Sequence, residues 1–235
     1  MVGDIVIITT NSPAAIASLR LLQLVSPALP VGAYSFSQGL EQAVQASWVT
    51  DSDSFFDWIS GIGTHSFARL ELPLLLRLYP AWQEQNNERI NHWNQFLLAA
   101  RETKELCLED QQMGEALKRL LDNLLEGQLS DEVTSEGSSF VTQFARAAVY
   151  WHIPVVDAGH GLAWSYVENQ VAAGLKLVLF GQTEGQRLLV RLSQLIPDWM
   201  RKAESLQHEH LVCSAPGLVR ASTQHEYQYS RLFRS

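Results

Sequence analysis

Apolar residues recur at intervals of three and four along most of this chain, which is the periodicity of an amphipathic α-helix. The alternating pattern of a β-strand is confined to residues 4–10. The expected helices begin at Ser12, near Ser35 or Ser37 and at 51–54, and then cover roughly residues 88–108, 109–125, 140–150, 157–180 and 184–204. A polar, glycine-containing stretch at 126–139 is expected to be a loop. We therefore predict an all-α fold, a single-domain bundle of about eight to ten helices.

Side chains that can cap helices mark several of the expected starts. Ser12 suits the N-cap position, and Pro13 suits the first helical turn, where its missing N–H costs nothing. Ser35 and Gln38 have the spacing of a capping box. Asp157 is expected to cap the helix that follows it.

The segment from Phe55 to Pro80 carries so little polar surface that a helix there is expected to be buried. Gly61, Gly63 and Pro73 lie inside this segment, and we expect them to break or bend the helix.

The end of the chain differs from the rest. Residues 1–210 are predicted to form the helical domain, whereas residues 211–235 show no helical stripe and are predicted to form an irregular tail. Aromatic and basic residues alternate in this tail, and such residues supply much of the binding energy of protein interfaces. One interpretation is that the tail becomes ordered on a partner protein; the other is that it folds back on its own core.

Composition and charge exclude several classes of protein. The chain has 235 residues and a formal net charge of -8, so it lacks the basic field that a nucleic-acid-binding protein needs. The two cysteines, Cys107 and Cys213, have no CxxC spacing, which argues against a disulfide scaffold and a zinc finger. The short apolar run near the N-terminus is neither a signal peptide nor a membrane span. We expect a cytoplasmic protein with no nucleic-acid or membrane partner.

Two groups of residues could hold a metal ion. Glu102, Glu105 and Glu109 would share one helix face, but the sequence has no Glu-x-x-His pair of the kind that di-metal bundles use. A solvated or interface face is the favoured interpretation, because Arg101 and Lys104 are interleaved with them. His152, Asp157 and His160 form the second group, since imidazole and carboxylate suit nickel or zinc.

No catalytic constellation is evident. The sequence has neither a GxSxG motif nor a GxxxxGK[ST] phosphate loop. His208 and His210 are interpreted as surface histidines, because a helix would point them apart. We therefore predict a protein that is not an enzyme and that has no cofactor and no resident metal site.

Four segments of the chain resemble the urease accessory protein UreF family. The first is LLQLVSPALPVGAYSFSQGLE at residues 21–41, and the second is ARETKELCLEDQQMG at 100–114. The third is SYVENQVAAGLKLVLFGQTEGQRLL at 165–189, and the last is HEYQYSRLFRS at 225–235. The four segments occur in the family's order and span nearly the whole chain, so the resemblance is specific.

The resemblance implies a role in assembly. UreF proteins are all-α, dimeric scaffolds that bind the accessory protein UreH, also called UreD, and through it the urease apoprotein. They also recruit UreG, the GTPase that carries nickel. By resemblance, this chain is a homodimeric, non-catalytic scaffold that brings UreG to the apoenzyme and modulates its GTPase. The alternative is that the chain itself binds or channels nickel through the carboxylates and histidines named above.

The resemblance and the residue pattern together predict a partner-binding surface. Pro27 and Pro30 would fix a turn, and Gly32 would permit a close backbone approach. The expected contact residues come from this turn and from the tail: Pro30, Gly32, Tyr34, Ser35, Ser37, Glu41, Tyr229, Arg231, Leu232, Phe233 and Arg234.

Overall fold

A computed structural model describes residues 12–124, 137–211 and 214–235, and within these ranges all the regular structure is helical. The α-helices are α1 (Pro13–Leu24), α2 (Leu40–Gln45), α3 (Ser52–His65), α4 (Glu71–Gln83), α5 (Asn87–Ala99), α6 (Lys104–Leu124), α7 (Phe140–Tyr150), α8 (Val155–Lys176), α9 (Gln182–Ser193), α10 (Ile196–Ser205) and α11 (Pro216–His225). Three short 3-10 helices, η1 (Ala33–Ser35), η2 (Phe67–Arg69) and η3 (His208–His210), complete the set. The predicted all-α fold is confirmed. The strand expected at residues 4–10 lies outside the described ranges.

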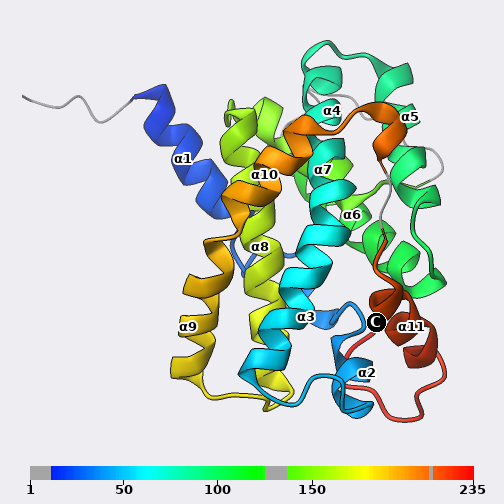
Figure 1. Ribbon diagram of the computed structural model, residues 1–235. Helices are drawn as coiled ribbons and strands as arrows, with labels where there is room; N and C mark the ends of the chain where they lie inside the picture. The colour runs from blue at the N-terminus through cyan, green and yellow to red at the C-terminus, as the bar shows by residue number, and fades with distance from the viewer. Residues whose placement is uncertain (1–11, 125–136, 212–213) are drawn as a thin grey trace, which may run out of the picture.

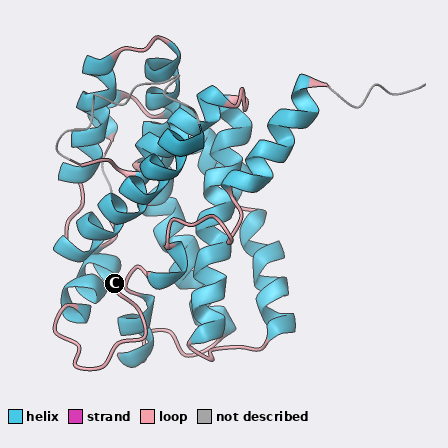
Figure 2. Cartoon of the chain, turned by 180° about the vertical axis from the view of Figure 1, so that it is seen from behind, coloured by secondary structure: helices cyan, strands magenta, loops and turns pink. Residues whose placement is uncertain are grey.

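Two helices, α4 and α8, form the centre of the bundle (Figure 1). Helix α4 packs against α5, α7, α8 and α10, and α7 in turn packs against α6. Helix α8 is covered on another side by α9. Helix α1 contacts α7 and α8 but extends away from the body, as the view from behind also shows (Figure 2).

The start of α3 was predicted correctly. The Asp51 side chain accepts a hydrogen bond from the Ser54 backbone N–H, and the Ser54 hydroxyl group lies within hydrogen-bonding distance of the Asp51 N–H, so the two residues form a capping box. The expected helix over 140–150 is also present as α7.

The long apolar segment breaks at a different place from the one expected. Helix α3 continues through Gly61 and Gly63 and ends at His65. The chain then passes through η2 before α4 begins at Glu71, and Pro73 lies in the first turn of α4, where it does no harm. Gly63 is needed for packing, because a Cβ atom there would lie 2.1 Å from the Trp199 ring.

Several other expected boundaries were wrong. Ser12 occupies the N-cap of α1 but its side chain makes no capping hydrogen bond, and Ser35 and Gln38 form no capping box because α2 begins only after Gly39. Asp157 lies inside the first turn of α8, whose N-cap is Pro154. The helices expected over 88–108 and 184–204 are each interrupted, at 100–103 and 194–195 respectively.

The tail is not wholly irregular. Residues Pro216–His225 form α11, which packs against α2 and α6. The remaining residues, 226–235, run back toward the body, and the C-terminal end lies close to α2 and α11 (Figure 1).

Candidate functional site

The last residues of the chain are hydrogen-bonded to the segment that precedes α2. The Ser37 N–H and the Ser37 hydroxyl group both donate to a main-chain oxygen of Ser235, over 2.8 and 2.6 Å. The Arg234 N–H donates to the Ser35 carbonyl oxygen over 2.8 Å. The first and last of the four family-like segments therefore meet in space.

A carboxylate on α2 holds the tail in this position. The Glu41 oxygens accept hydrogen bonds from the backbone N–H groups of Leu232, at 2.8 Å, and Phe233, at 2.9 Å. Glu41 is only 6% exposed, so these donors, and not bulk water, satisfy its oxygens. Phe233 is itself buried, with the Lys176 ammonium group 4.0 Å from its ring centroid.

A second carboxylate, Glu105 on α6, is joined to the first by a histidine. His225 is fully buried, with its Nδ1 atom 2.9 Å from Glu105 and its Nε2 atom 3.3 Å from Glu41. The two ring nitrogens of His225 therefore contact both carboxylates at once. Arg231 also donates to Glu105, over 3.0 Å.

A third carboxylate, Glu109, binds the last residue. It accepts hydrogen bonds from the Ser235 hydroxyl group, at 2.6 Å, and from the Gln38 amide, at 2.8 Å. Burial raises the pKa of Glu109 to about 7, although these two hydrogen bonds and Arg101 act in the opposite direction. We refer to Glu41, Glu105 and Glu109 together as the tail anchor.

The tail can come this close because of a glycine before α2. Gly39 has a φ of 75°, in the left-handed region, and a Cβ atom there would lie 3.0 Å from the Ala221 Cβ atom of α11. Gly32 also has a positive φ, of 77°, but nothing lies within 4 Å of where its Cβ would be. The expected close approach at Gly32 was therefore wrong; its role is to allow the left-handed turn.

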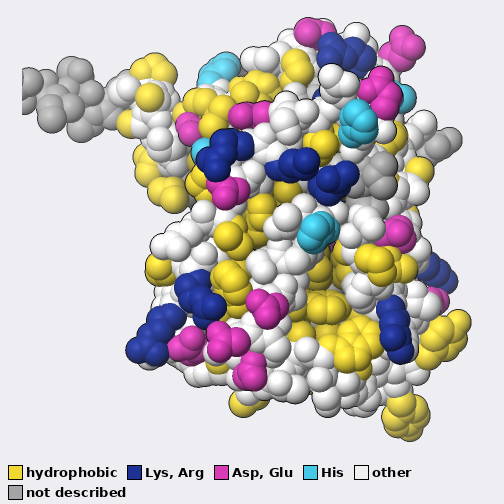
Figure 3. Space-filling model, in the orientation of Figure 1, with side chains coloured by type: hydrophobic (Ala, Val, Ile, Leu, Met, Phe, Trp, Pro, Cys, Tyr) yellow, Lys and Arg dark blue, Asp and Glu magenta, His cyan; other side chains and the backbone are white. Residues whose placement is uncertain are grey.

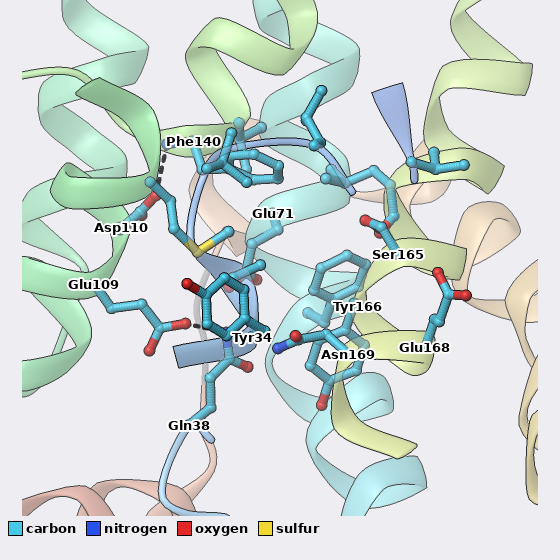
Figure 4. A pocket seen from close by; sticks show the side chains of 18 of the residues that line it. Tyr34, Gln38, Glu71, Glu109, Asp110, Phe140, Ser165, Tyr166, Glu168 and Asn169 are labelled. Atoms are coloured by element: carbon cyan, nitrogen blue, oxygen red, sulfur yellow. Dashed lines mark hydrogen bonds between the residues drawn. The ribbon is translucent and has the colours of Figure 1, made fainter. Parts of the chain in front are cut away.

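A cavity of about 170 Å³ lies beside the tail anchor, between the 24–38 segment and α8 (Figure 4). Its wall includes Arg101, which forms ion pairs with Glu71, at 2.6 Å, and Asp110, at 2.8 Å. Burial acts to lower the pKa of Arg101, but these two carboxylates outweigh it and the pKa is raised. Tyr34 also lines the cavity, and the residue is 72% exposed.

Comparison with known proteins decides the family. The family model described as UreF matches residues 49–193. The chain is 49% identical over 217 residues to the urease accessory protein UreF of Teredinibacter turnerae, covering 92% of this chain and 98% of that protein. It is 46% identical over 222 residues to the urease accessory protein UreF of Pseudomonas putida, covering 94% of this chain and 98% of that protein.

The chain belongs to the UreF family. The family-like segments at residues 21–41, 100–114 and 225–235 contain the whole tail anchor and the residues bound to it. This UreF chain therefore uses parts of three widely separated family segments to position its own C-terminal end.

The predicted contact residues divide into two groups. Ser37, Glu41 and Phe233 are buried, so they position the tail and are not available at the surface. Exposed or partly exposed side chains belong to Pro30, Tyr34, Ser35, Tyr229, Arg231, Leu232 and Arg234, and Gly32 is half-buried. Tyr227, which the sequence did not single out as a contact residue, is also exposed.

The favoured interpretation of the three glutamates was partly wrong. Glu105 and Glu109 do not belong to a solvated face, because both are buried and bound to the tail, whereas Glu102 is exposed and precedes α6. Within the described residues, no group of three or more His, Cys, Asp or Glu side chains could hold a metal ion. Neither the alternative group of His152, Asp157 and His160 nor the three glutamates is therefore arranged to hold a metal ion.

Sequence reasoning missed two residues that contact the tail anchor: His225, and Gln228, whose side-chain amide donates to Glu41 over 3.4 Å. The available signal was the pairing of an acidic cluster at 102–110 with a tail rich in arginine and amide side chains.

No helix in the described part of the chain is long and apolar enough to cross a membrane.

Proposed function

We propose that this chain is a non-catalytic scaffold in urease maturation, which bridges UreH/UreD, carrying the urease apoprotein, and the GTPase UreG. Membership of a family whose members are named urease accessory proteins supports the role in maturation. The bridging role, the modulation of UreG, the homodimer and the cytoplasmic location are our proposals.

The observation that carries the proposal is the folded-back tail. Because the buried Glu41 carboxylate holds the backbone of Leu232 and Phe233, the backbone that carries the neighbouring exposed side chains is held in place. Tyr229 is fully exposed and Leu232 is 59% exposed, so both are free to contact a partner. Aromatic and arginine side chains on an ordered support lose little entropy on binding, which suits a docking surface.

A second exposed apolar surface supports an assembly role. Helix α1 carries Ile16, Leu19 and Leu22, which are 46%, 61% and 65% exposed. Apolar side chains are prominent on this projecting helix in the space-filling view (Figure 3). Clustered exposed apolar residues of this kind are typical of protein–protein contact sites.

The test is complex formation with purified UreH/UreD and UreG, read as molar mass by light scattering during size exclusion. We expect the full chain to form a complex with both partners and the double variant Tyr229→Ala with Leu232→Ala to lose UreH/UreD. The matched control replaces two exposed valines on another face, Val178→Ala and Val190→Ala, and should bind normally. The GTP hydrolysis rate of UreG, with and without the complex, tests the modulation.

Two results would contradict the proposal at different levels. If the tail variant binds UreH/UreD as well as the control does, the tail is not the docking surface. If the unaltered chain binds neither partner, the bridging role itself is wrong.

A further inference from the structure

Two buried side chains that line the cavity beside the tail anchor each carry an unpaired oxygen atom. Tyr166 on α8 is 9% exposed, and Glu71 on α4 is 8% exposed. Glu71 Oε1 accepts a hydrogen bond from Arg101, but among the described residues neither Glu71 Oε2 nor the Tyr166 hydroxyl group has a partner. Both residues lie around the same space (Figure 4). Because buried polar groups are normally hydrogen-bonded, these two atoms mark a place where a ligand can supply the missing contacts.

The rest of the cavity wall is largely apolar. Aliphatic and aromatic side chains make up most of it, among them Leu29, Val31, Phe67, Met113, Phe140 and Leu162. The volume is about 170 Å³, and an apolar cavity of about 150 Å³ can hold benzene. A buried water molecule needs about three hydrogen bonds, which aliphatic side chains cannot supply. The cavity therefore suits an organic molecule with an apolar group of this size better than a cluster of waters.

The charges of the wall favour a cation. The acidic residues that line the cavity are Glu71, Glu109, Asp110 and Glu168. Arg101 is the one basic residue among the described residues of the wall, and it is already paired with Glu71 and Asp110. An organic anion would therefore be repelled, whereas a protonated amine would be attracted.

A protonated amine also supplies the hydrogen bonds that the two unpaired oxygens need. Burial, together with the charges of Glu71 and Glu109, raises the pKa of the Tyr166 hydroxyl group, which therefore stays neutral. A neutral hydroxyl oxygen and a carboxylate oxygen can both accept from an ammonium group, which has three donors. A metal ion is a poorer occupant, because within the described residues no group of three His, Cys, Asp or Glu side chains could hold one.

The cavity reaches the surface beside Tyr34. This residue lines the cavity and is 72% exposed. Pro27 and Ala172, which line the cavity as well, are also exposed. A small molecule can therefore enter without unfolding of the bundle.

We propose that this cavity binds a small organic cation, an amine or amidine carried by an apolar group. The cationic group donates to Glu71 and Tyr166, and the apolar group packs against the aliphatic and aromatic wall. A concave, mostly apolar site with a few polar groups is typical of small-molecule binding. This site does not depend on the partner-bridging role, because all the residues that it uses line one cavity within the chain.

The experiment titrates benzylamine into the full chain at neutral pH, where the amine is protonated, and follows the heat of binding. We expect saturable binding of one molecule per chain. Benzoate has the same ring and the opposite charge, so it should bind about tenfold more weakly or less well still. Benzyl alcohol, which has the same ring and no charge, should bind with an affinity between the two.

The Tyr166→Phe variant tests the polar contact. It removes the hydroxyl group and keeps the ring, which stacks on Phe67 with centroids 4.7 Å apart. We expect the affinity for benzylamine to fall roughly two- to tenfold, the effect of one net hydrogen bond. The stability of the free chain should not fall, because the hydroxyl group that is removed has no partner among the described residues.

Tyr79→Phe is the matched control. The Tyr79 hydroxyl group donates to the Ile153 carbonyl oxygen over 2.8 Å, and Tyr79 does not line this cavity. Its loss should therefore lower stability and leave benzylamine binding unchanged, which is the opposite of the result expected for Tyr166→Phe.

The Ala172→Trp variant tests the location of the site. It places a large side chain at the exposed edge of the cavity and should abolish measurable binding. Val156→Trp is its control, because Val156 is exposed on the same helix and does not line this cavity. Thermal unfolding confirms that each variant retains the fold. The proposal is overturned if the unaltered chain shows no saturable binding of benzylamine, if benzoate binds as tightly, or if folded Tyr166→Phe and Ala172→Trp variants bind benzylamine like the unaltered chain.

Discussion

The carboxylate of Glu41 accepts a 2.9 Å hydrogen bond from the backbone N–H of Phe233, which is 192 residues further along the chain. The side chain of Gln at this position would turn an N–H₂ group toward at least one of the backbone donors that Glu41 satisfies. We expect Glu41→Gln to lower the free energy of unfolding by about 1–3 kcal/mol, because a buried donor loses its partner. Urea denaturation measures this change, and limited proteolysis should show faster cleavage within 226–235.

The control is Glu226→Gln, which removes an exposed carboxylate close to the same part of the tail. We expect it to change stability by no more than about 0.5 kcal/mol. Equal effects of the two substitutions would show that Glu41 does not hold the tail.

Two glycines on α3, only two residues apart, should respond oppositely to alanine. A Cβ atom at Gly63 would lie 2.1 Å from the Trp199 ring, whereas one at Gly61 would meet nothing within 4 Å. We expect Gly63→Ala to destabilise the chain by about 1–3 kcal/mol or more through overpacking. Gly61→Ala should stabilise it by about 0.5–1 kcal/mol, because alanine loses less entropy in a helix. Thermal unfolding of both variants tests the packing of α3 on α10, and two changes of the same sign would contradict it.

The ion pairs of Arg101 beside the cavity should be far more important for stability than an exposed pair. Arg101→Met leaves the buried Glu71 and Asp110 without their cation. We expect a loss of about 3–5 kcal/mol, the usual effect of breaking a buried pair. Arg89→Met, which removes an exposed pair with Glu84, should cost only about 0–1 kcal/mol. Denaturant unfolding compares the two, and a small loss for Arg101→Met would mean that the carboxylates find other partners.

The helices could be predicted largely from local pattern, because their signals lie within a few residues of one another. The Asp51 and Ser54 capping box and the apolar stripe of α7 are of this kind. Helix α11 was missed because its packing against Gly39 depends on residues nearly 180 positions away, which no local pattern contains.

The partner-contact role of the turn and tail residues stays a prediction, whereas the internal arrangement of the tail anchor was not predicted. Charged residues such as Glu41 and Glu105 are normally assigned to the surface, yet both are buried here. Contacts from distant parts of the chain stabilise these buried carboxylates: the Arg231 guanidinium, the His225 ring and the backbone N–H groups of the tail. That pairing belongs to the tertiary structure, so sequence spacing alone could not show it.

Glu109 should make the stability of the chain depend on pH. Burial raises its pKa from 4.5 to about 7, so the folded chain holds a proton that the unfolded chain has lost between these values. The contribution of this group to stability therefore falls as the pH rises from about 4.5 to about 7, and stays low above that. The glutamine side chain of the Glu109→Gln variant carries no charge at pH 5 or at pH 8. The free energy of unfolding of this variant, relative to that of the unaltered chain, should therefore be higher at pH 8 than at pH 5. Urea denaturation of both proteins at the two pH values measures this, and a relative stability that does not change with pH would show that Glu109 ionises normally despite its burial.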